Sequence, residues 1–109
     1  MCQAGRVSEW TALEDEAVRI TRELIRIDTS NFGDGSGPTE RAAADYVIGL
    51  LREVGLDPSL YESQPGRATV AVRIAGADRS AGGLVVHGHL DVVPANAADW
   101  SVDPFGAEI

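Results

Sequence analysis

Three side chains that can bind metal ions lie close together in the second half of the chain. His87, His89 and Asp91 are each separated by one residue, and the sequence contains no other histidine. Imidazole nitrogens and carboxylate oxygens are common zinc ligands in proteins. Because successive side chains of a strand point to opposite faces, all three would face the same side of a strand. Their types and spacing therefore indicate a metal site.

Two arrangements of a metal site are compatible with this spacing. In the first, all three side chains bind metal, as in an H-x-H-x-D-H hydrolase of the metallo-β-lactamase kind. In the second, His89 alone binds metal, and Asp91 accepts a hydrogen bond from the other ring nitrogen and so fixes the tautomer. The first motif needs a further histidine at position 92, where this sequence has Val92. The second arrangement is therefore favoured, and the first remains an alternative.

Two helices are predicted ahead of these residues. Apolar residues at steps of four and three indicate a first helix over residues 9–27, and a second apolar stripe indicates a helix over residues 39–54. Gly55 follows the second stripe, where a left-handed residue often ends a helix. The polar, glycine-containing segment between the helices, residues 28–38, is interpreted as a connecting loop.

Strand-like patterns follow the helices. Residues 59–63 give a weak pattern and residues 68–74 a stronger one, and the apolar run Leu84, Val85 and Val86 predicts a third strand, buried on both faces. The expected order is helix, helix, strand, strand, strand, which makes the fold class α/β. His87 would then end a buried strand, where α/β folds tend to place ligand-binding groups.

Composition excludes several classes of function. The net charge is −8, from 17 acidic and 9 basic residues, which argues against binding to nucleic acid or to an anionic membrane. The single cysteine, Cys2, permits no intrachain disulfide. No apolar run approaches the roughly 20 residues of a membrane helix, and the first residues lack the apolar core of a signal peptide. We expect a cytoplasmic protein with a small-molecule partner, no nucleic acid and no membrane.

The segment around the two histidines resembles a known signature. His89-Leu90-Asp91-Val92-Val93-Pro94 resembles the H-x-D-V-V-P motif of the co-catalytic zinc peptidases and deacylases, the family of aminoacylase, acetylornithine deacetylase, succinyl-diaminopimelate desuccinylase and carboxypeptidase G. Trp100, followed by Pro104 and Phe105, resembles the W-x-x-x-P-F that comes next in that family. The resemblance covers about residues 12–109.

The resemblance implies a fold and a domain organisation. It identifies residues 1–109 as the N-terminal fragment of a metallohydrolase catalytic domain of three α/β/α layers, with residues 1–7 as a flexible lead. The rest of that domain, and a dimerisation domain through which a homodimer is possible, would be absent. The family's remaining metal ligands and its general base would lie beyond residue 109, so the fragment alone is expected to be inactive.

The resemblance also implies roles for two residues. His89 corresponds to the family's first metal ligand, and Asp91 to the acidic residue that orients this ligand and is counted as catalytic; His87 has no family role. The implied cofactor is zinc, with two ions per active site in the full-length parent and Co²⁺ able to substitute. The implied reaction is hydrolysis of the amide bond of an N-acyl amino acid or peptide by metal-activated water. A stand-alone, non-catalytic metal-binding or interaction domain remains the alternative.

Overall fold

The computed structural model describes residues 12–109, which divide into two compact units. One unit contains the first helix and the C-terminal stretch, residues 12–28 together with Ala95–Ile109, and the other is Thr29–Pro94. The predicted flexible lead, residues 1–7, and the first three residues of the first predicted helix lie outside the described residues. Each unit is considered by itself.

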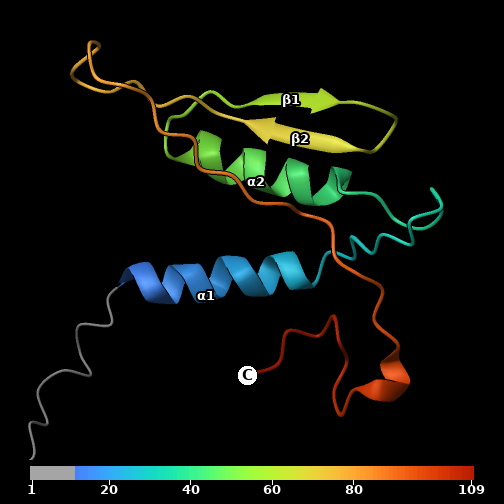
Figure 1. Ribbon diagram of the computed structural model, residues 1–109. Coiled ribbons are helices and arrows are strands. Elements are labelled where there is room, and N and C mark those ends of the chain that lie inside the picture. The colour runs from blue at the N-terminus through green and yellow to red at the C-terminus, as the bar shows by residue number, and fades with distance from the viewer. Residues whose placement is uncertain (1–11) are drawn as a thin grey trace, which may run out of the picture. The chain divides into compact units, whose positions relative to one another are not determined.

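The unit Thr29–Pro94 is built from one helix and one hairpin. Helix α2 (Arg41–Glu53) lies against the antiparallel strands β1 (Ser59–Glu62) and β2 (Ala68–Ala71), as Figure 1 shows. In the hairpin Ser59 is opposite Ala71 and Glu62 is opposite Ala68. Both hairpin strands were predicted at these positions, although β2 ends at Ala71 instead of residue 74.

Small side chains form the buried face of α2. Ala43, Ala44 and Ile48 are 1%, 0% and 8% exposed; the two alanines are adjacent, and Ile48 follows about one turn later on the same face of the helix. Two adjacent alanines let the backbone of the helix come close to its neighbours, since neither carries a side chain beyond Cβ. The apolar stripe that predicted this helix therefore contains the face that the unit buries.

The two ends of α2 lie close to the predicted ones, and local hydrogen bonds explain the C-terminal end. The helix begins at Arg41, two residues later than predicted, and its N-cap residue is Glu40. At the other end Gly55 has φ +82°, as the sequence predicted. The Gly55 N–H donates to the carbonyl of Arg52 at 2.9 Å, and the Leu56 N–H donates to that of Leu51 at 3.0 Å. This pair of hydrogen bonds is a Schellman motif, which satisfies two carbonyls that the helix leaves free.

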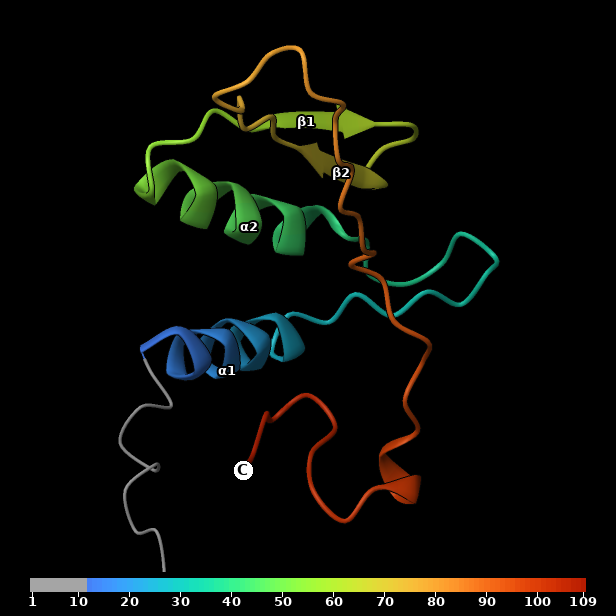
Figure 2. The ribbon, with the colours of Figure 1, turned by 60° about the vertical axis from the view of Figure 1, so that its left-hand side comes forward.

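The other unit contains helix α1 (Ala12–Ile25) and a short 3₁₀ helix, η1 (Ala97–Asp99), both visible in Figure 2. The Nε–H of Arg22 on α1 donates to the Ala107 carbonyl at 2.9 Å, which ties the C-terminal stretch to the helix. Ala107 is 8% exposed, whereas no residue of α1 is fully buried. The predicted first helix is thus confirmed between residues 12 and 25. Among the described residues no helix is long and apolar enough to span a membrane.

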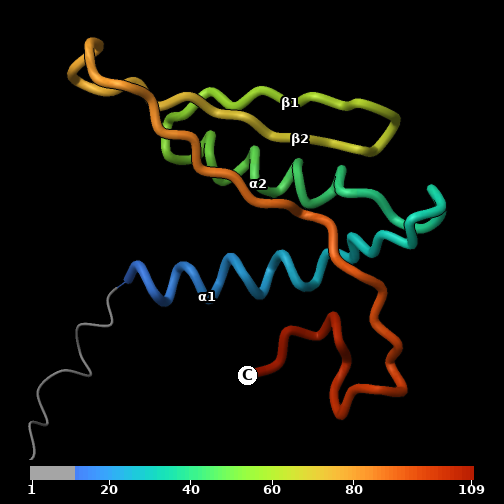
Figure 3. Tube along the Cα trace, in the orientation of Figure 1, coloured from blue at the N-terminus to red at the C-terminus, as the bar shows by residue number. Residues whose placement is uncertain are grey.

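The prediction of a third strand is wrong for this chain. Leu84, Val85 and Val86 belong to no strand and are 88%, 84% and 87% exposed. Between β2 and η1 the chain runs on without a helix or a strand, and Figure 3 traces this long stretch. A strand requires a neighbour to accept and donate its backbone hydrogen bonds, and β1 and β2 pair with each other. The described residues therefore form two helices and a two-stranded sheet, an α/β fragment without the three layers.

Candidate functional site

The segment that carries Asp91 is held by a second segment from far away in the sequence. The Asn31 N–H donates to the Val92 carbonyl at 2.8 Å, and the Val92 N–H donates to the Thr29 carbonyl at 3.2 Å. The Thr29 hydroxyl donates to the Leu90 carbonyl at 2.7 Å. Ser30 pairs with Val92 in a parallel bridge. Residues 29–31, which come shortly after the end of α1 at Ile25, thus anchor residues 90–92.

His89 and Asp91 are in direct contact. The Nδ1 atom of His89 lies 3.0 Å from Asp91 Oδ1 and 2.8 Å from the Asp91 carbonyl oxygen. The histidine side chain is 82% exposed and the aspartate side chain 31%. Nε2, on the opposite edge of the imidazole, takes no part in these contacts. The structure therefore brings together the two residues that the sequence singled out, and it leaves the outer nitrogen of the ring available.

Asn31 is the second partner of Asp91. Its Nδ2 donates to Asp91 Oδ2 at 2.9 Å, so that each carboxylate oxygen accepts a hydrogen bond from a different side chain. The Asn31 hydrogen bond is the main cause that lowers the pKa of Asp91 below its ordinary value; partial burial opposes this, and the hydrogen bond and charge of His89 act in the same direction as Asn31. An ionised carboxylate accepts a proton-bearing Nδ1, which leaves the lone pair of His89 on Nε2. That is the form of imidazole that binds a metal.

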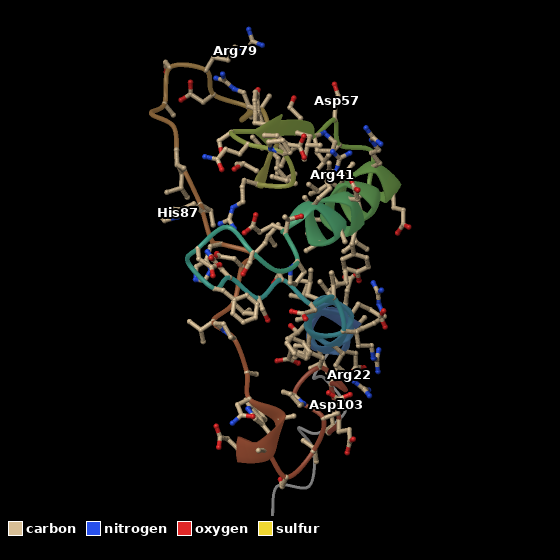
Figure 4. All side chains as sticks on the ribbon, turned by 90° about the vertical axis from the view of Figure 1, so that its right-hand side faces the viewer. Arg22, Arg41, Asp57, Arg79, His87 and Asp103 are labelled. Atoms are coloured by element: carbon tan, nitrogen blue, oxygen red, sulfur yellow. The ribbon has the colours of Figure 1, made fainter. Side chains whose placement is uncertain are left out.

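His87 does not join this arrangement. Figure 4 shows it on the outward side of the extended segment, with α2 on the other side. Over residues 12–109 no group of three or more histidine, cysteine, aspartate or glutamate side chains is placed to hold a metal ion. A catalytic zinc typically has three protein ligands. The described residues thus supply one candidate ligand, His89, and the arrangement with all three side chains as ligands is not formed.

A hollow of about 480 Å³ borders the His89–Asp91 pair. Val47 of α2 and Val70 of β2 form an apolar part of the wall of this hollow, and residues 88–91 form another part of the wall. Its polar lining includes Glu40 and Arg67, whose side chains form an ion pair at 2.9 Å. The Glu40 side chain is 8% exposed, so this carboxylate depends on Arg67 for its charge partner.

Sequence analysis did not identify Asn31 as part of the site. It lies in the segment that was interpreted as a connecting loop, and this interpretation is correct for the backbone. Asn31 and Asp91 are 60 residues apart, and no local pattern links them. The only sequence signal was position, because Asn31 follows the Ile25-Arg26-Ile27-Asp28-Thr29-Ser30 run that resembles the start of the zinc peptidase and deacylase family.

Comparisons with known proteins agree with that resemblance. Aminoacylase-1 of Dictyostelium discoideum is 29% identical over 94 residues, which are 86% of this chain and 22% of that protein. Succinyl-diaminopimelate desuccinylase of Methylocella silvestris is 33% identical over 102 residues, which are 89% of this chain and 24% of that protein. Human aminoacylase-1 is 29% identical over 94 residues, with 86% of this chain and 22% of that protein covered.

The chain spans less than a quarter of the length of these curated relatives. No family model matches the chain, and no solved structure matches it. The names of the relatives denote hydrolases that remove acyl groups, and the matches extend over most of the chain. The chain is therefore a homologue of the aminoacylase and succinyl-diaminopimelate desuccinylase family.

Proposed function

We propose that this chain is the N-terminal part of the catalytic domain of a zinc-dependent hydrolase that cleaves the amide bond of an N-acyl amino acid or peptide. The catalytic domain would have three α/β/α layers and would hold two zinc ions. His89 would be one zinc ligand through Nε2, and Asp91 would orient it. The similarity to aminoacylase-1 and to succinyl-diaminopimelate desuccinylase supports the class of reaction.

One observation carries the proposed role of His89. Its Nδ1 is held 3.0 Å from an Asp91 oxygen, while the rest of the ring is exposed. Carboxylates hold metal-binding histidines in this way, because the hydrogen bond fixes the tautomer and the orientation of the ring and makes Nε2 more basic.

The reaction consumes water and gives two products. The oxygen of water adds to the amide carbonyl carbon, the C–N bond breaks, and the products are a carboxylate and an amine. When bound, zinc polarises the carbonyl and lowers the pKa of the attacking water. In this chain His89 would hold a ligand position, and the Asp91 carboxylate would keep the proton of His89 on Nδ1. The hollow lined by Val47 and Val70 lies beside them.

A first experiment uses the longer protein that the proposal implies. His89→Ala is expected to remove most of the activity and to weaken zinc binding at one site, measured by metal analysis and by hydrolysis of N-acetyl amino acids. Asp91→Ala is expected to lower metal affinity or activity 10–100-fold, the usual loss on removal of a histidine's partner. His87→Ala is the matched control and should change both much less. Equal losses for His87→Ala and His89→Ala would contradict the proposed ligand.

A second experiment uses the 109-residue chain itself. The described residues contain one candidate zinc ligand, so the chain is expected to hydrolyse neither N-acetyl amino acids nor dipeptides in the presence of Zn²⁺ or Co²⁺. The His89→Ala chain provides the background rate. Metal-dependent turnover above that background would show that the chain holds a complete site, and the proposed division of the site would be wrong.

A further inference from the structure

The side chain of Asn31 is held at both ends of its amide group. The oxygen Oδ1 accepts a hydrogen bond from the Gly33 N–H at 2.9 Å, and the nitrogen Nδ2 donates to Asp91 Oδ2 at 2.9 Å. The Gly33 N–H can only donate and an ionised carboxylate can only accept. Turning the amide over would place donor against donor and acceptor against acceptor. The orientation of the Asn31 amide is therefore determined by its two neighbours.

The backbone of Asn31 is held as well. Its N–H donates to the Val92 carbonyl at 2.8 Å, one residue beyond the aspartate that its side chain contacts. Ser30 next to it is 3% exposed and pairs with Val92. The backbone of Asn31 is thus already fixed against the segment that carries Asp91. Forming the side-chain hydrogen bond therefore costs only the entropy of the two rotatable bonds of the Asn31 side chain.

We propose that Asn31 is a positioning residue for the zinc ligand: it holds the Asp91 carboxylate at the angle at which Oδ1 meets His89 Nδ1. The carboxylate then acts together with the Asp91 carbonyl oxygen, 2.8 Å from the same nitrogen, in favouring the tautomer of His89 that is protonated on Nδ1. This inference rests on the proposed function for its meaning in catalysis, but the hydrogen-bond chain from Gly33 through Asn31 and Asp91 to His89 stands on the distances alone.

The chemistry of the position favours asparagine over its nearest substitutes. Aspartate has the same shape, but it would place a second carboxylate oxygen against Asp91 where an N–H now lies. Alanine would leave Asp91 Oδ2 without this donor and free to rotate. With either residue, the carboxylate loses the contact that orients it, and of the two acceptors of His89 Nδ1 only the Asp91 carbonyl oxygen stays fixed.

The tautomer of His89 can be measured in the 109-residue chain carrying Val85→Asp, which places a charge in the exposed apolar run 84–86 and should suppress self-association at the concentrations that NMR requires. In a ¹⁵N-labelled sample, long-range proton–nitrogen correlation spectra at alkaline pH distinguish a ring protonated on Nδ1 from one protonated on Nε2. The chain has only two histidines, so His87 is an internal reference in the same spectrum. We expect His89 to carry its proton on Nδ1 and His87 to show the mixture typical of a free imidazole.

Asn31→Asp and Asn31→Ala are expected to shift the tautomer ratio of His89 several-fold toward that of His87. The matched control is Asp34→Asn, the reverse exchange three residues along the same loop, where the side chain accepts hydrogen bonds from Ser36; it should leave His89 unchanged. If Asp91→Ala shifts the tautomer ratio and both Asn31 variants leave it unchanged, Asn31 has no positioning role.

A measurement on Asn31 itself keeps the proposal testable if its variants fold poorly. The side-chain amide signal of Asn31 should move in the Asp91→Asn chain and stay in place in the Asp34→Asn chain; an unmoved signal in Asp91→Asn would overturn the proposal. Neither readout requires zinc or activity. A failure of this inference is therefore distinct from a failure of the proposed function, which the metal content of the His89→Ala protein tests.

Discussion

The exposed run of Leu84, Val85 and Val86 predicts how the isolated chain behaves in solution. These side chains are 84–88% exposed, so nearly all of the free energy that their burial would release is unrealised. Complete burial of a large aliphatic side chain contributes about 1.5–3 kcal/mol, which gives roughly 5–9 kcal/mol for the three. This sum is similar to the total stability of many small domains. The chain is therefore expected to be marginally stable and to self-associate at micromolar concentration.

The substitution Val85→Asp tests this expectation at the centre of the run. Because the Val85 side chain is 84% exposed, the change should alter the free energy of unfolding of the monomer by less than about 0.5 kcal/mol. It should nevertheless lower the weight-average mass in sedimentation velocity across a concentration series, since a charge must then be desolvated whenever the run is covered. Gln64→Asp, an exposed site in the turn between β1 and β2, changes the net charge equally and is the control.

Two results would refute this reasoning. One is a parent chain that remains a monodisperse monomer throughout the concentration series with a sharp, reversible unfolding transition. The other is an equal decrease in association for Val85→Asp and Gln64→Asp, which would mean that net charge, and not the apolar run, controls the association.

Two further predictions concern the stability of the unit Thr29–Pro94, measured by urea unfolding followed by circular dichroism. Gly66→Ala is expected to lower the free energy of unfolding by about 2–5 kcal/mol, because Gly66 has φ +81° and an added Cβ would lie 2.5–2.7 Å from atoms of Thr39. The control is Gly55→Ala, where φ is +82° but the space around an added Cβ is open, and it should lower that free energy by only about 1–2 kcal/mol. Equal losses for the two variants would contradict the close contact at Gly66. Arg67→Ala is expected to lower the free energy of unfolding by about 1–3 kcal/mol, because the Glu40 side chain is 8% exposed and its carboxylate loses its partner. Adding Glu40→Gln removes the unpaired charge and should restore part of that free energy. If the double variant recovered no stability, the ion pair would not be the cause of the loss.

The helices and the hairpin were predictable because their signals are local. The stripe over residues 39–54 contains Ala43, Ala44 and Ile48, which the structure buries. The helix ends where Gly55 and Leu56 donate hydrogen bonds to carbonyls three and five positions earlier, respectively. Such contacts depend on the conformation of a few neighbouring residues. The run 84–86 has an equally strong local pattern, but it forms no strand, because a strand also requires a pairing partner from elsewhere.

The contact between His89 and Asp91 could also be predicted from the sequence, because it is local. The two residues are separated by one position, and the choice between three ligands and one ligand with a partner could be argued from Val92 alone. Their roles in metal binding remain predictions. The sequence also placed the chain with the aminoacylases and desuccinylases, since the H-x-D-V-V-P motif is contiguous.

The sequence by itself determined where the helices and the hairpin lie and which known proteins the chain resembles, and it predicted which residues carry the chemistry. Only the tertiary structure decided which distant segments meet: that Asn31 fixes the Asp91 carboxylate from 60 residues away, and that Arg67 neutralises the Glu40 carboxylate beside the same hollow. The physical reason is the range of the interactions. Backbone conformation responds to a few neighbouring residues, whereas a hydrogen bond between remote side chains forms only after packing has brought their segments together.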